Sequence, residues 1–148
     1  MRLLIQRVKN SSVSVNGKKI SEIGRGLLVF VGIGKEDNEK DLKKLSDKLI
    51  KLRIFEDENG KMNLNVNQAK GSILSVPQFT LYADTRKGNR PGFEFSADPK
   101  KAKGDWEKFN GFVEEGGVVP KKGVFGEHME VNLINDGPVT IWLDSKEV

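Results

Sequence analysis

Residues 26–34 read GLLVFVGIG, the longest run of apolar residues and glycines in the chain. Its β-branched and aromatic residues favour a strand, and a strand that is apolar throughout is buried on both faces. We therefore expect Leu27–Ile33 to be a central strand of a sheet. The run of nine residues is too short to cross a bilayer as a helix, which takes about 20 residues.

Helical periodicity begins after this strand. A candidate cap at Asp37 or Asn38 precedes leucines at helical spacing, which predict a helix through Leu42, Leu45, Leu49, Ile50 and Leu52. Asp98 followed by Pro99 is a typical helix start. A second helix is predicted from there to Gly116-Gly117, with the apolar stripe Ala102, Trp106, Phe109 and Val113. We expect Trp106 and the later Trp142 to lie in the core.

The remaining apolar segments alternate as strands do. A hairpin signal at Asn16-Gly17 joins two of them, and the expected strands are residues 2–8, 12–15, 18–23, 53–55, 62–66, 72–76, 78–83, 129–134 and 139–143. Two helices and about nine strands predict an α/β fold of the α+β type, either a layered sheet or a partly closed barrel. No repeat, low-complexity tract or linker divides the chain, so we expect residues 1–148 to form a single domain.

The cysteine and histidine counts exclude several kinds of site. The 148 residues contain no cysteine and one histidine, His128. A disulfide scaffold, a cysteine-ligated metal, a cysteine nucleophile and a zinc site with several histidines are therefore excluded, and we expect no metal and no cofactor. A Ser-His-Asp triad would need His128, which we expect to be hydrogen-bonded or exposed rather than catalytic.

The charge balance is mildly basic, since 25 Lys and Arg against 21 Asp and Glu give a net charge of +4. This favours an anionic partner without establishing one. The N-terminal apolar run Leu3-Leu4-Ile5 ends at Gln6-Arg7 and is too short for the core of a signal peptide. We therefore expect a cytoplasmic protein without a membrane segment.

Glycine clusters and basic segments each allow two interpretations. The glycine clusters at residues 24–26 and 32–35 could be interpreted as phosphate-binding loops. Neither has the residue spacing of a P-loop, so we favour tight turns beside the buried strand. Residues 84–92 form either a solvated loop or a loop that binds phosphodiester oxygens through Arg86, Lys87 and Arg90. A solvated surface is the favoured interpretation for Lys100, Lys101, Lys103, Lys121 and Lys122.

Two prolines interrupt strand patterns. Pro77 marks a strand edge or a bulge, because proline donates no ladder hydrogen bond. Gln78-Phe79-Thr80 behind it are either ordinary strand residues or a functional group of side chains. Asp136-Gly137 is typical of a hairpin turn between two strands, and composition alone favours a trans bond before Pro138.

These segments, taken in order along the chain, resemble the D-aminoacyl-tRNA deacylase family. The matching blocks are Ile5–Val8, Ile23–Leu28, Leu52–Phe55, Gly60–Asn63, Gln78–Gly88 and Asn135–Thr140. The resemblance implies a cytoplasmic homodimer of compact, sheet-rich domains. It implies hydrolysis of the ester between a D-amino acid and the terminal ribose of tRNA, and also the clearing of glycine mischarged onto tRNA.

The family's Ser-Gln-x-Thr motif reads Pro77-Gln78-Phe79-Thr80 in this chain, so the serine hydroxyl is absent. The resemblance implies that Gln78, Phe79 and Thr80 are catalytic. It also implies that the Gly137-Pro138 bond is cis and that these two residues are inserted into the partner subunit's pocket. There, the carbonyls of Gly137 and Pro138 exclude L-amino acids. By the same resemblance, Arg7 and Met129 bind substrate; our first candidates for contacting the acceptor end of the tRNA are Arg86, Lys87 and Arg90.

A threonine hydroxyl is a weak nucleophile without a base, and nothing in the spacing places His128 near Thr80. We therefore expect Thr80 to position the ester while main-chain donors and the 2′-hydroxyl of the RNA assist its hydrolysis. Two alternatives stay open: an RNA-binding or proofreading-associated module without catalysis, and a different hydrolase that uses Thr80 with His128. Neither DNA nor a membrane is expected as a partner.

Overall fold

A computed structural model describes all residues of the protein, Met1–Val148. A six-stranded mixed sheet dominates it, in the order β2-β1-β3-β6-β7 with β8 paired to β1. Its strands are β1 (Arg2–Val15), β2 (Lys18–Ile23), β3 (Gly26–Gly32), β6 (Ser72–Pro77), β7 (Lys121–Lys122) and β8 (Glu130–Asp144). A separate two-stranded sheet joins β4 (Phe55–Glu56) to β5 (Met62–Leu64).

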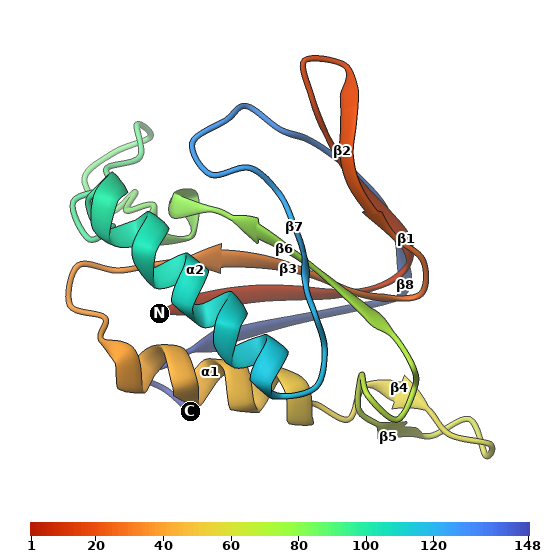
Figure 1. The fold of residues 1–148 in the computed structure, drawn as a ribbon. Coiled ribbons are helices and arrows are strands. Elements are labelled where there is room, and N and C mark those ends of the chain that lie inside the picture. Colours follow the sequence, from red (N-terminus) through yellow and green to blue (C-terminus); the bar gives the residue numbers. More distant parts are fainter.

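The large sheet curls back on itself. Its β2 end comes close to β7, where the Ser21 hydroxyl donates to the Lys122 carbonyl at 2.9 Å. Figure 1 shows the β1–β2 hairpin rising from the sheet, while both helices cover one face. The partly closed barrel with two main helices predicted from the sequence is thereby confirmed.

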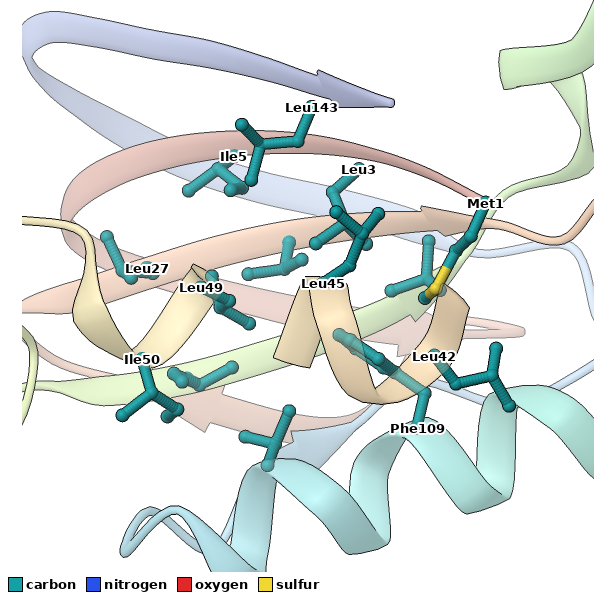
Figure 2. Close-up of a cluster of buried hydrophobic side chains, with 14 of the residues drawn as sticks. Met1, Leu3, Ile5, Leu27, Leu42, Leu45, Leu49, Ile50, Phe109 and Leu143 are labelled. Carbon is teal, nitrogen blue, oxygen red and sulfur yellow. The ribbon is translucent and has the colours of Figure 1, made fainter. Parts of the chain in front are cut away.

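Two hydrophobic clusters lie on opposite faces of β3. Leu27, Val29 and Val31 belong to the cluster between the sheet and the helices, which Figure 2 shows around Leu45, Leu49 and Phe109. Leu28 belongs to the second cluster, with Val8, Val13, Ile23, Leu74 and Val76. The prediction that this strand is buried on both faces is therefore confirmed.

Both helices begin where their sequence signals placed them. Helix α1 (Glu39–Lys51) is capped by Asn38, whose side chain accepts from the Lys40 N–H at 3.0 Å. Helix α2 (Pro99–Glu115) is capped by Asp98, which accepts from Lys100 and Lys101 at 3.1 Å. Neither helix has the length and apolar character needed to span a lipid bilayer.

Several sequence predictions were wrong, among them a strand over residues 53–55, since β4 begins only at Phe55. Residues 78–83 do not form a strand but contain a 3₁₀ turn, η1 (Phe79–Tyr82). Residues 129–134 and 139–143 are not two strands joined by a hairpin, because both pair with β1 in one antiparallel direction within β8. Trp142 is 44% exposed rather than in the core, whereas Trp106 is buried and its indole N–H donates to Ser75 Oγ at 2.9 Å.

Glycine at position 26 permits a close backbone approach. A Cβ on Gly26 would lie 2.0 Å from the Ser72 carbonyl oxygen on the neighbouring strand β6. Gly24, two residues earlier in the bend between β2 and β3, has no atom within 4 Å of its Cβ position. The first glycine is therefore required by packing, and the second is not.

We expect Gly26→Ala to lower the free energy of unfolding by about 1–3 kcal/mol or more, because backbone atoms must move to admit the methyl group. Urea denaturation measures the change. Gly24→Ala is the matched control and should stay within about 1 kcal/mol of the wild type. Equal stabilities of the two variants would show that the β3–β6 contact is not tightly packed.

Candidate active site

The turn after β6 brings Gln78, Phe79 and Thr80 together at the surface. The Gln78 N–H donates to the Val31 carbonyl at 2.8 Å, which extends the β3–β6 ladder by one bond before the chain turns. The Gln78 side-chain amide donates to Thr80 Oγ1. Because an amide N–H is a donor and takes no proton, this contact orients the threonine hydroxyl without activating it as a nucleophile.

Arg2 fixes the far end of this turn. Its guanidinium donates to the Leu81 carbonyl and to Asp144, both at 2.9 Å. The same group lies 4.4 Å above the centre of the Tyr82 ring, a cation–π contact. Arg2 thereby ties the turn to β1 and to the end of β8.

Asp37 is the buried centre of the contacts beneath the turn. Its carboxylate accepts from the Met1 ammonium, from the Gly34 N–H at 2.6 Å and from the Tyr82 hydroxyl at 3.2 Å. Burial, followed by the nearby carboxylates of Asp37 and Asp144, raises the pKa of Tyr82 well above its ordinary value of 10.0. Tyr82 thus remains a neutral hydrogen-bond donor.

Two glycines let the turn lie flat against the end of β3. A Cβ on Gly32 would lie 3.0 Å from the Leu81 Cβ, and one on Gly34 would lie 2.7 Å from the Tyr82 hydroxyl. The two glycines therefore serve close packing, and neither has a positive φ angle. The tight turn predicted beside the buried strand is confirmed, since the Asp37 N–H donates to the Gly34 carbonyl at 3.2 Å directly after β3.

A cavity of about 780 Å³ opens beside the turn. Gln78, Phe79, His128 and Met129 line it together with further aromatic side chains, among them Phe30, Phe93, Trp106 and Phe125. The rings of Phe79 and Phe93 meet edge to face with centroids 4.9 Å apart. Its volume and largely apolar lining are typical of a small-molecule site.

Gly137 and Pro138 lie in a bulge of β8. Val8 pairs with Asn135 and Gln6 with Thr140, so residues 136–139 loop out opposite Arg7. The Asn135 amide closes the loop by donating to the Val139 carbonyl at 3.0 Å. The Gly137–Pro138 bond is cis, as the resemblance implied and against the expectation from composition.

Arg7 supports this bulge from below. Its buried guanidinium donates to the carbonyls of Asp136 at 3.3 Å and Ile54 at 2.7 Å. It also forms an ion pair with the Asp136 carboxylate at 3.2 Å. Arg7 therefore lies beside Gly137 and does not line the cavity that contains Gln78.

The structure keeps the two predicted motifs apart. Arg2 contacts the Gln78–Tyr82 turn and Arg7 contacts the Gly137 bulge. These two arginines are five residues apart on the same strand, which corresponds to about 17 Å. Gly137 and Pro138 are exposed, and neither lines the cavity that contains Gln78.

The predicted RNA-binding loop lies outside the cavity. Arg86 is held by Asp84 through two side-chain bonds of 2.8 and 2.7 Å, and this pairing lowers the pKa of Asp84 to about 2. Lys87 and Arg90 are exposed and form no ion pair. Most of the available positive charge in this loop therefore belongs to these two residues.

Comparison with known proteins identifies the family. The model of the family described as D-Tyr-tRNA(Tyr) deacylase matches residues 4–144. A D-aminoacyl-tRNA deacylase from Dictyoglomus turgidum is 53% identical over 148 residues, which cover 100% of this chain and 95% of the relative. The chain belongs to the D-Tyr-tRNA(Tyr) deacylase family.

Another relative and two solved structures are also similar to this deacylase chain. A D-aminoacyl-tRNA deacylase from Thermosipho africanus is 53% identical and covers 100% of this chain and 99% of its own. A solved structure titled "c-Myc DNA Unwinding Element Binding Protein" has a TM-score of 0.93 at 41% identity, covering 97% of this chain and 98% of its own. A probable eukaryotic D-amino acid tRNA deacylase, 18% identical with a TM-score of 0.83 over 96% of this chain and 97% of its own, shares the fold. The resemblance drawn from the sequence is confirmed, and the deacylase chain is a hydrolase.

Sequence reasoning missed the residues that hold the Gln78–Tyr82 turn in place. Arg2, Asp37 and Tyr82 meet from three distant parts of the chain, so no local spacing connects them. Asp37 gave a partial signal as a candidate helix cap, but Asn38 takes that role and leaves Asp37 buried. Phe93 was likewise missed, because it lies in a loop without periodicity.

Proposed function

We propose that this protein hydrolyses the ester bond of D-aminoacyl-tRNA and releases the free D-amino acid and the tRNA. Glycine mischarged onto tRNA is a second substrate, since it has no side chain for the site to reject. The observation that carries the proposal is the exposed Gln78–Thr80 turn beside an aromatic cavity in a chain of the deacylase family.

The terminal adenosine of the tRNA enters the aromatic cavity. Proteins that bind single-stranded RNA stack unpaired bases on aromatic side chains. Phe79 is 55% exposed and meets Phe93 at the rim of the cavity. Met129 lines the same cavity and would contact the base or the amino acid. This arrangement presents the ester to Gln78 and Thr80.

Hydrolysis uses main-chain donors and the RNA itself. The first N–H groups of a helical turn have no partner within the turn, and no side chain caps η1. These N–H groups stabilise the developing oxyanion, an interaction that typically contributes about 10²–10³ in rate per donor. The 2′-hydroxyl next to the ester assists the attacking water, while Thr80 positions the ester. Pro77 offers no hydroxyl, so the mechanism needs none at that position.

Gly137 and Pro138 of a second subunit complete the site and reject L-amino acids. Gly137 and Pro138 are exposed and lie away from Gln78 within one chain, which supports their insertion into the site of the other subunit. Selectivity then comes from rigid backbone atoms placed where an L side chain would lie. Arg7 supports that backbone from below and thereby contributes to substrate binding indirectly.

The protein acts as a cytoplasmic homodimer of single domains that each span residues 1–148. Lys87 and Arg90, with a smaller share from Arg86, contact the acceptor-end phosphates of the tRNA. The partner is RNA rather than DNA, although one solved relative is titled as a DNA-element binding protein.

The Gln78–Thr80 contact argues against a hydrolase that uses Thr80 with His128. His128 lines the cavity but makes no hydrogen bond to Thr80, whose hydroxyl oxygen accepts from Gln78. A module without catalysis would bind the RNA and leave the ester intact. The hydrolysis assay below separates that module from the enzyme.

The purified protein should release D-tyrosine from D-tyrosyl-tRNA and leave L-tyrosyl-tRNA intact, because the Gly137-Pro138 backbone rejects the L side chain. Counting the released labelled amino acid over time measures both rates. A protein that binds D-tyrosyl-tRNA without hydrolysing it would contradict the proposed function and support the module without catalysis.

A substrate without the terminal 2′-hydroxyl should be cleaved about 10²-fold more slowly or worse, the usual contribution of an assisting proton-transfer group. The measurement compares single-turnover rates for D-tyrosyl-tRNA ending in adenosine or in 2′-deoxyadenosine. Full-speed cleavage of the deoxy substrate would show that the protein alone supplies the assisting group.

Gly137→Ala should lower kcat/KM for D-tyrosyl-tRNA by about 10- to 10²-fold, the scale expected for a displacement near 1 Å. Gly137 has a φ angle of +121°, and a Cβ there would lie 2.9 Å from the Val139 nitrogen and 3.2 Å from Arg7 Nη2. Gly60→Ala is the matched control, since its φ is +72° with no atom within 4 Å. Equal rates and equal D/L selectivity in both variants would remove Gly137 from the site.

A further inference from the structure

A second cavity of about 450 Å³ lies next to the aromatic cavity and has no assigned role. Lys35 is the one residue that lines both. Most of the other residues around the second cavity are charged, including Arg2, Glu36, Asp37, Glu94 and Lys146. The volume is within the range of ligand sites, which starts at about 300 Å³.

A single turn over residues 93–96 contributes one aromatic ring to the lining of each cavity. The Ser96 N–H donates to the Phe93 carbonyl at 3.0 Å, which closes a turn over residues 93–96. Phe93 lines the first cavity, and Phe95 lines the second and is 49% exposed. Arg86 lies over the Phe95 ring at 5.5 Å. An exposed ring beside a guanidinium is a stacking platform of the kind that binds unpaired bases.

Main-chain bonds hold this turn against Lys35. The Lys35 N–H donates to the Phe95 carbonyl at 3.1 Å, and the Ala97 N–H donates to the Ile33 carbonyl at 3.0 Å. The backbone at Phe93, Phe95 and Lys35 therefore keeps a fixed relation between the three residues. A preformed site of this kind loses little conformational entropy on binding.

Lys35 has a free charge at the junction of the cavities. Nearby cations are paired, Lys146 with Glu36 at 2.9 Å and Arg2 with Asp144 at 2.9 Å. Lys35 is exposed and forms no such pair. An unpaired ammonium between two base-sized cavities is placed where a phosphodiester joining two nucleosides would pass.

We propose that the second cavity binds the nucleotide that precedes the terminal adenosine of the tRNA. Its base stacks on Phe95, and Lys35 contacts the phosphate between the two nucleosides. This subsite rests on the proposed function, because it assumes that the adenosine occupies the first cavity. The preceding nucleotide of tRNA is cytidine, whose amino group suits the unpaired carboxylate of Glu94.

The test measures binding rather than hydrolysis, so that its result is independent of the catalytic assay. The dissociation constants of cytidylyl-(3′→5′)-adenosine and of adenosine are measured by titration calorimetry or NMR shifts. The wild type should bind the dinucleotide about tenfold more tightly, within the range for one stacked base. The ratio should fall towards one in Phe95→Ala and be restored in Phe95→Trp, which keeps a stacking surface.

Lys35→Ala tests the phosphate contact. A plot of log K for the dinucleotide against log salt should become shallower by about 0.7, the value for one phosphate in a single strand. Lys48→Ala is the matched control, because Lys48 is exposed on α1 and lines neither cavity. It should keep the wild-type slope.

Two results would overturn the subsite: equal binding of dinucleotide and adenosine by the wild type, or a ratio that Phe95→Ala leaves unchanged. Failure to hydrolyse D-tyrosyl-tRNA, with the binding ratio intact, would instead refute the catalytic proposal and retain the subsite. The two proposals therefore fail separately.

Discussion

Burial of β3 on both faces is the constraint on which the rest of the molecule depends. Its odd-numbered apolar residues pack against the two helices, and Leu28 packs into the curled half of the sheet. A strand used in this way must have close neighbours on every side. Gly26 admits the backbone of β6, while Gly32 and Gly34 admit the turn that contains Gln78 and Thr80. The packing of one strand thus positions the candidate active site.

The site is built from groups that hold one another rather than from a single reactive side chain. Arg2 and Asp37 both hold the Leu81–Tyr82 end of the turn, Gln78 orients Thr80, and Arg7 supports the Gly137 bulge. No base contacts the threonine hydroxyl. Such a site suits a substrate whose ester is already labile, because orientation and oxyanion stabilisation are then sufficient.

Local signals predicted the regular elements well. The apolar strand, the Asn38 and Asp98 caps and the Asn16-Gly17 hairpin all appear in the structure, since each depends on a few neighbouring residues. Local signals failed where a distant partner decides the conformation. Residues 78–83 alternate like a strand, yet Tyr82 turns inward to reach Asp37. Asp136-Gly137 predicts a hairpin turn, yet the segments on both sides of it pair with β1 rather than with each other.

The sequence by itself determined the fold class, the two helices, the doubly buried strand and the family, because periodicity, capping and motif order are properties of the linear chain. Tertiary structure alone decided which residues share a cavity. It placed Phe79 with Met129, separated Gln78 from Gly137, and put Lys35 between two cavities. The physical reason is that long-range packing and buried hydrogen bonds set these neighbours, and residues far apart in sequence leave no local trace of such contacts.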